Sequence, residues 1–169
     1  MIPFNELLQH SLIYGAILSA LLSALIIASL YLRPMIWIAD ATPEVQAVAP
    51  PLSAADRRAK AVAGVLFFAI LIGTMVVGLI TLRDLSGGPL TFTEASLATF
   101  IIFQTFNLVD LVVLDWLIVE WWRPSFITFP GAAGLDLFPG YVHHFVGFLK
   151  GTAIGLAAGL VVGVLVLIF

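Results

Sequence analysis

The chain has 169 residues, of which 62% are hydrophobic and 10% are charged, and its mean hydropathy is +1.14. A soluble domain has roughly 45–50% apolar and about 25% charged residues, so this composition is that of a membrane protein. The net charge of -3 excludes a basic surface for nucleic acid, and the absence of cysteine excludes disulfides and thiolate metal sites.

Four stretches are long enough to cross a bilayer, because a helical span needs about 20 predominantly apolar residues. They are Ser11–Leu32, Ala61–Leu82, Ala95–Trp122 and Phe145–Phe169. Inside the hydrocarbon no water can satisfy backbone polar groups, so these stretches are expected to be helices. We predict an all-α, four-helix transmembrane bundle that forms a single membrane domain over residues 1–169.

Lysine and arginine are divided unevenly between the two ends of such a bundle. Six lie at one end, and only Arg83 lies at the other; the six are Arg33, Arg57, Arg58, Lys60, Arg123 and Lys150. The positive-inside rule therefore places the loops around residues 33–60 and 123–144 in the cytoplasm and both termini outside. We expect a multi-pass protein of the cytoplasmic membrane, with Trp121 and Trp122 in the inner aromatic belt.

Two sequence patterns predict where helices begin. Ser53-Ala54-Ala55-Asp56 and Thr91-Phe92-Thr93-Glu94 match the capping box, in which a hydroxyl and an acid three residues later satisfy each other's backbone amides. The second and third helices should therefore begin before they enter the membrane.

The third stretch carries three acids, Asp110, Asp115 and Glu120. At about 100° per residue, one helix face gathers several polar side chains and the central acid; these are Ser96, Thr99, Asn107 and Asp110. Asp115 lies on the flank of this face. Glu120 points elsewhere, near the aromatic belt, where we expect it to reach water.

Asp110 falls near the bilayer centre, where an ionisable side chain is expensive and marks a functional site. We favour a proton or cation site at Asp110, oriented by Asn107 one turn away, with Asp115 and Thr99 beside it. No lysine or arginine within the hydrocarbon can pair with the carboxylate, which favours an exchangeable ion. The alternative is that Asp110 joins helices through hydrogen bonds.

The fourth stretch carries glycines at strict four-residue spacing. They are Gly147, Gly151, Gly155, Gly159 and Gly163. Small residues at this spacing indicate close helix packing in membranes, a glycine zipper. We favour the first span as its partner, since Gly15, Ser19 and Ser23 offer a matching face, and another copy of the chain is the alternative.

Histidines and acids at the cytoplasmic end form a possible metal set. Its members are Asp115, Glu120, His143 and His144. Their spacing matches no metal motif, and adjacent histidines at a membrane surface are commonly solvated. Because His10 lies at the opposite end, a bis-histidine haem is not expected, and the sequence indicates no other cofactor.

A pattern between residues 106 and 151 resembles a family of bacterial multi-span membrane proteins with no assigned activity. The shared elements are D-L-x-x-x-D-W, P-G and H-x-x-G-F-x-x-G, here Asp110 to Trp116, Pro130-Gly131 and His144 to Gly151. The resemblance implies that Asp110, Asp115, Trp116, His144 and Gly147 form one site or one packing core, in a bacterial inner membrane. The apolar loop Ala132–Phe138 departs from the more polar loop of that family.

Three functions follow from these patterns. The leading one is an ion-, proton- or solute-handling protein, or a subunit of one, with Asp110 as its central site. The second is a structural or assembly subunit, in which the polar stripe and the glycine face bind other membrane subunits or a second copy. The third is a membrane enzyme that uses Asp115, Glu120 and His144, although no phosphate loop, HExxH or GxSxG motif is present.

Overall fold

The computed structural model describes residues 2–168, which form helices and loops with no strand among them. In chain order the elements are α1 (Phe4–Leu32), η1 (Pro34–Asp40), α2 (Pro43–Val48), α3 (Ala54–Ser86), α4 (Phe92–Val109), η2 (Asp110–Trp122) and α5 (Tyr141–Ile168). Four helices are long and apolar enough to cross a membrane: α1, α3, the continuous α4–η2 helix and α5. The predicted all-α architecture with four spans is confirmed.

Local signals set the helix ends. The Ser53 hydroxyl accepts a hydrogen bond from the Asp56 amide at 3.1 Å, and the Asp56 carboxylate accepts one from the Ser53 amide at 3.3 Å. Thr91 and Glu94 make the same reciprocal pair at the start of α4. Gly87 ends α3 with φ 69°, a left-handed conformation that favours glycine. Both predicted capping boxes are confirmed.

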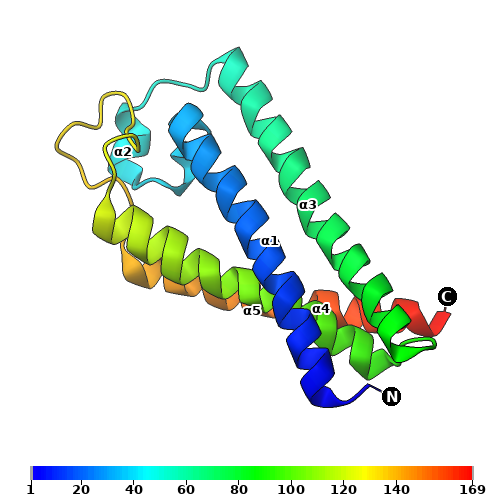
Figure 1. Cartoon of the computed structure of the whole chain (residues 1–169). Coiled ribbons are helices and arrows are strands. Elements are labelled where there is room, and N and C mark those ends of the chain that lie inside the picture. The colour runs from blue at the N-terminus through cyan, green and yellow to red at the C-terminus, as the bar shows by residue number, and fades with distance from the viewer. Residues whose placement is uncertain (1, 169) are drawn as a thin grey trace.

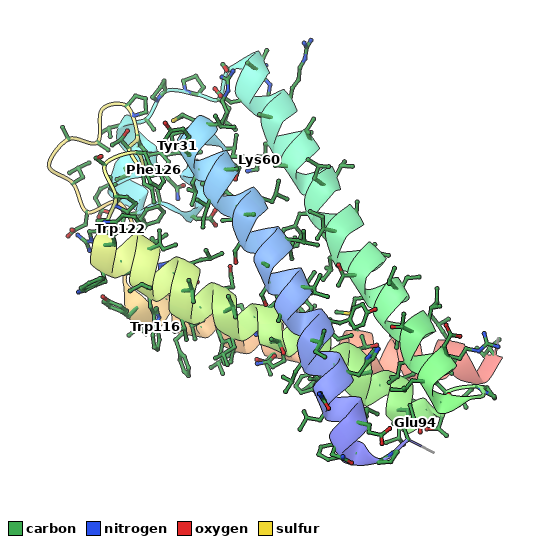
Figure 2. All side chains as sticks on the ribbon, viewed as in Figure 1. Tyr31, Lys60, Glu94, Trp116, Trp122 and Phe126 are labelled. Atoms are coloured by element: carbon green, nitrogen blue, oxygen red, sulfur yellow. The ribbon has the colours of Figure 1, made fainter. Side chains whose placement is uncertain are left out.

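The loops and turns lie at two opposite ends of the helix bundle. The α3–α4 turn and the first and last described residues lie at one end, while η1, α2 and the loop 123–140 lie at the other (Figure 1). We call the second end the loop end. Figure 2 shows Tyr31 and Phe126 close together there, with ring centroids 5.5 Å apart, and Glu94 at the opposite end. An even number of spans brings both chain ends to the same side of the bundle.

Helix α4 lies at the centre of the packing, because it contacts both α1 and α5, while α1 also contacts α3. Leu18 and Leu22 of α1 and Ile102 of α4 are completely buried in one apolar cluster. A second cluster, with Leu82 of α3 and Ala95 of α4, fills the end that holds the chain ends. The two clusters hold α1, α3 and α4 together along their length.

The glycine face of α5 packs against α4 rather than against α1. A Cβ atom at Gly155 would lie 2.6 Å from the Phe103 ring, and one at Gly159 would lie 2.7 Å from the Ser96 carbonyl oxygen. A Cβ at Gly147 would meet nothing within 4 Å. Within the described residues, α5 makes no contact with α1. The first span was thus the wrong partner, because its own small face already packs against α4.

The loop end is closed by packing between two loops. The Thr42 amide donates to the Leu137 carbonyl oxygen at 3.0 Å, and the Thr42 hydroxyl donates to the Asp136 carbonyl oxygen at 2.8 Å. Val45 of α2 and Phe129 of the loop 123–140 are both buried in one small apolar cluster. The apolar character of Ala132–Phe138 follows from this contact, since Ala132 and Leu137 belong to it.

Candidate functional site

The third membrane helix changes its hydrogen-bond register at Asp110. From Asp110 to Trp122 the backbone forms a π-helix, closed by a bond from the Arg123 amide to the Ile118 carbonyl oxygen at 3.0 Å. In an α-helix, residues five apart point about 140° away from each other. In a π-helix the backbone hydrogen bond joins residues five apart, and a smaller rotation separates their side chains than in an α-helix. Asp110 and Asp115 both line one cavity beside η2, and Asp115 and Glu120 both contact His144.

The cavity that Asp110 and Asp115 line has a volume of about 320 Å³, and we call it the inner cavity. It lies between η2, the first turns of α5, α1 and η1. Its polar lining is Asp40, Asn107, Asp110, Asp115, His143 and His144. Its apolar lining is Ile26, Leu30, Trp37, Leu111, Leu114, Val119, Phe138, Gly147 and Phe148. Neither lysine nor arginine lines this cavity among residues 2–168.

His144 joins two of the acids. Its Nδ1 lies 3.2 Å from Asp115 Oδ2, and its Nε2 lies 3.0 Å from Glu120 Oε1. The His144 side chain is 11% exposed and that of Glu120 is 2% exposed. Both ring nitrogens therefore have carboxylate partners, and the imidazole forms a bridge between the inner cavity and Glu120.

Glu120 is buried, contrary to the expectation that it would reach water at the aromatic belt. Its Oε1 accepts a hydrogen bond from the Gly140 amide at 2.9 Å, and its Oε2 pairs with Arg123 Nη2 at 3.3 Å. Arg123 also pairs with Asp136, which is largely exposed, at 3.4 Å. The expectation was wrong because it follows from α-helical spacing, whereas the π-helix turns Glu120 toward His144.

Asp110 faces the inner cavity, and within the described part of the chain its carboxyl makes no side-chain hydrogen bond or ion pair. Asn107 was expected to orient it. The Asn107 amide instead donates to the Phe148 carbonyl oxygen at 3.1 Å and to the Thr152 hydroxyl at 3.3 Å, both on α5. Asn107 therefore joins α4 to α5 and does not orient Asp110.

Thr99 and Ser96 lie away from the inner cavity. Thr99 is 2% exposed, and its hydroxyl has no hydrogen-bond partner among residues 2–168. Ser96 faces α5, where a Cβ at Gly159 would contact its carbonyl oxygen. The predicted polar stripe is therefore divided: Asn107, Asp110 and Asp115 meet at the cavity, and Thr99 does not join them.

The predicted metal set is brought partly together. Asp115, His144 and Glu120 meet, but as a hydrogen-bonded series in which the two carboxylates lie on opposite ring nitrogens. His143 is exposed and faces His144 edge-on, with ring centroids 6.0 Å apart. Within residues 2–168, no three His, Asp or Glu side chains have an arrangement that could hold a metal ion.

Trp116, which the resemblance placed with the acids, contacts the beginning of α5. Its indole N–H donates to the Tyr141 carbonyl oxygen at 3.3 Å, and the two rings meet edge-on with centroids 5.9 Å apart. Figure 2 shows Trp116 projecting from the ribbon on the η2 side of the molecule. Trp116 thus holds η2 and α5 together and does not line the inner cavity.

Two lining residues from η1 were not predicted. The Trp37 indole N–H donates to the Ser29 hydroxyl at 2.9 Å, which holds η1 against α1. Asp40, at the end of η1, lies at the mouth of the inner cavity. Partial removal from water raises the pKa of Asp40, while the positive charge of Lys60 opposes this. The available signal was an acid directly after the apolar segment 35–39.

Comparison with protein-family models, with curated proteins and with solved structures finds no match for this chain. The resemblance seen between residues 106 and 151 therefore stays a prediction.

Proposed function

We propose that this chain is a proton- or small-cation-handling protein of a bacterial cytoplasmic membrane, or a subunit of one, and that its site is the inner cavity. One observation carries the proposal: the Asp110 carboxyl faces the cavity without a hydrogen-bond or ion-pair partner among residues 2–168, while Asn107 and His144 beside it are paired. An unpaired carboxylate in a low-dielectric site is costly. Binding of a proton or cation removes that cost.

The charges around the cavity support a cationic occupant. Asp40, Asp110 and Asp115 contribute three carboxyl groups, and no lysine or arginine among the described residues lines the cavity with them. Carboxyl groups at close range repel one another when all are ionised, so uptake of positive charge is favoured. An anionic substrate would be repelled.

The distribution of basic residues supports an orientation for the protein. With the loop end in the cytoplasm, both termini face outward, and Asp115 and Glu120 lie on the cytoplasmic side of Asp110. Trp121 and Trp122 are exposed at the loop end, as an aromatic belt requires.

Flux measurements in proteoliposomes test the proposal. Asp110→Asn should abolish or alter proton or cation flux while the protein still elutes as a folded species in detergent. Asp84→Asn is the matched control, because Asp84 is exposed at the end of α3 opposite the loop end. Unchanged flux in Asp110→Asn, or no flux in the parent protein, would count against the proposal.

A structural or assembly subunit is the second candidate. It is favoured by the position of α5, which contacts only α4 and η2 among the described elements and exposes apolar side chains such as Ile154 and Val161 on its other faces. These faces suit lipid, a second copy or another membrane subunit. A larger complex that co-purifies with the chain would favour this function, and a stable monomer with measurable flux would favour the first.

A further inference from the structure

A second cavity lies on the other side of the His144–Glu120 contact. Its volume is about 480 Å³, and we call it the loop cavity. Glu120, Arg123 and Asp136 line it. The Asp136 side chain is 84% exposed and that of Arg123 is 55% exposed, so the loop cavity opens at the surface of the loop end. Asp110 and Asp115 line the inner cavity and not this one.

We infer that the ion handled at the inner cavity is the proton, and that His144 passes it between Asp115 and Glu120, which exchanges it with water in the loop cavity. This inference rests on the proposed function and specifies its substrate. It assigns the loop cavity as the cytoplasmic mouth of the route.

The contacts between the two cavities suit a proton and exclude a larger ion. Asp115, His144 and Glu120 are joined at 3.2 Å and 3.0 Å, which are hydrogen-bond distances. A neutral imidazole has one nitrogen that accepts and one that donates, so it can take a proton on one side and release one on the other. A metal cation would have to break both contacts and lose water beside the nearly buried Glu120.

The transfer balances without any co-reactant. The Oδ2–H bond of protonated Asp115 breaks as an N–H bond forms at His144 Nδ1. The Nε2–H bond breaks as an O–H bond forms at Glu120 Oε1, so the ring stays neutral overall. Glu120 then gives its proton to water in the loop cavity. The ring now carries its proton on Nδ1, and a flip of the ring turns the bare Nε2 toward Asp115 and the Nδ1–H toward Glu120, which readies it for the next proton. The same steps run in reverse for uptake.

The other partners of Glu120 lie toward the loop cavity. Arg123 pairs with its Oε2, and the Gly140 amide donates to its Oε1. Asp136 holds Arg123 from the surface, and Glu44 lines the same cavity. On the inner side, the groups that face the relay are Asp40, Asp110, Asp115 and His143, with Lys60 acting on Asp40 from α3. Acids therefore line both cavities, and among the described residues Arg123 is the one lysine or arginine that lines either of them, on the side of the loop cavity.

Proton flux into proteoliposomes, followed with an entrapped pH dye, tests the relay. Glu120→Gln and His144→Ala should each lower the flux by roughly a hundredfold, the effect of removing a positioned proton-transfer group. Added imidazole should restore flux in His144→Ala and not in Glu120→Gln. Glu6→Gln, an exposed acid at the opposite end, is the control and should keep the parent flux.

The possible failures separate the two proposals. Proton flux that requires Asp110 but is unchanged in Glu120→Gln overturns the relay and leaves the proposed function. Sodium or potassium tracer flux that requires Asp110, without proton flux, overturns the proton as substrate. Absence of any flux in the parent overturns both.

A spectroscopic measurement covers the case in which a variant does not fold. NMR of isotope-labelled histidine in the parent protein should show both His144 ring nitrogens hydrogen-bonded and exchanging between tautomers. His10→Gln and His143→Gln assign the signal. A single fixed tautomer at every pH overturns the relay.

Discussion

The two halves of the third membrane helix use polar residues in different ways. In α4, Asn107 and Gln104 are joined to Thr152 of α5, and the Asn107 amide also donates to a carbonyl oxygen of that helix. In η2, Asp110 faces the inner cavity and has no hydrogen-bond or ion-pair partner in the described part of the chain. Gln104, Asn107 and Asp110 are close together in the sequence. Whether a polar side chain serves packing or chemistry depends on whether the neighbouring helix satisfies it.

The two halves of this helix also differ in their backbone hydrogen-bond register. Across α4 the polar residues follow α-helical spacing and meet α5, whose glycines allow the close approach. From Asp110 onward the helix is a π-helix. Such helices are rare in proteins, and those that occur are often found at functional sites. The change of register directs Glu120 toward His144, so Asp115 and Glu120 contact the same imidazole.

The largest expected effect comes from moving one acid by a single position. In an α-helix, position 119 would lie almost above Asp115, whereas in η2 it is Glu120 that contacts the same imidazole as Asp115. The exchange Val119→Glu with Glu120→Val should therefore abolish proton flux, although composition is unchanged. Flux restored to the parent level in this double variant would show that η2 is α-helical in the membrane. Gel filtration of the detergent-solubilised variant checks that the fold survives.

Substitution of a glycine on α5 by alanine tests the packing between α4 and α5. A Cβ at Gly159 would lie 2.7 Å from the Ser96 carbonyl oxygen, so Gly159→Ala should force α4 and α5 apart. We expect a loss of about 2 kcal/mol in the free energy of unfolding, typical of an overpacked core. Chemical unfolding in detergent measures it.

Gly147→Ala is the control for Gly159→Ala. It lies on the same helix in the same four-residue series, but its added methyl would meet nothing within 4 Å. Its stability should be unchanged or slightly higher, since alanine favours a helix over glycine. Equal losses in both variants would mean that the loss in Gly159→Ala does not come from contact with α4.

Substitutions of Asn107 and Asp110 should have smaller and different effects on the free energy of unfolding. Asn107→Ala removes interhelical hydrogen bonds to α5 and should lower the unfolding free energy by about 1 kcal/mol. Asp110→Asn should leave stability unchanged or raise it, because no protein contact is lost. The same unfolding measurement checks both. A loss in Asp110→Asn as large as that in Asn107→Ala would make Asp110 a packing residue.

Much of the fold could be predicted, because the signals are local. Apolar runs of sufficient length marked all four spans, and the acid three residues after Ser53 and after Thr91 marked two helix starts. The partner of the glycine face could not be predicted in this way. Gly15 of α1 is as small as any α5 glycine, yet a Cβ there would lie 2.5 Å from Thr105 of α4. Small residues indicate close packing but do not say against which helix.

The site was predicted in part. Asp110, Asp115 and His144 meet at the inner cavity, since acids in a membrane span must face the interior of the bundle. Glu120 was misplaced because hydrogen-bond register is not visible in composition, and the only hint was the five-residue spacing of the acids. Asp40 was missed because it reaches the cavity from η1, through packing between loops that no local pattern specifies.

Substitution of Asp40 should have the smallest effect on stability. Asp40 lines the inner cavity but is exposed at its mouth. Its pKa is raised in the folded protein by partial removal from water, so the stability linked to its protonated form is present below the ordinary pKa of about 3.9 and is lost as pH rises through the folded value. Asp40→Asn should therefore raise the melting temperature slightly at neutral pH and not at acidic pH. Because the charge of Lys60 opposes this shift, the gain should be greater in a Lys60→Gln background. A gain that does not depend on pH would show that Asp40 is fully hydrated and outside the electrostatic reach of the cavity.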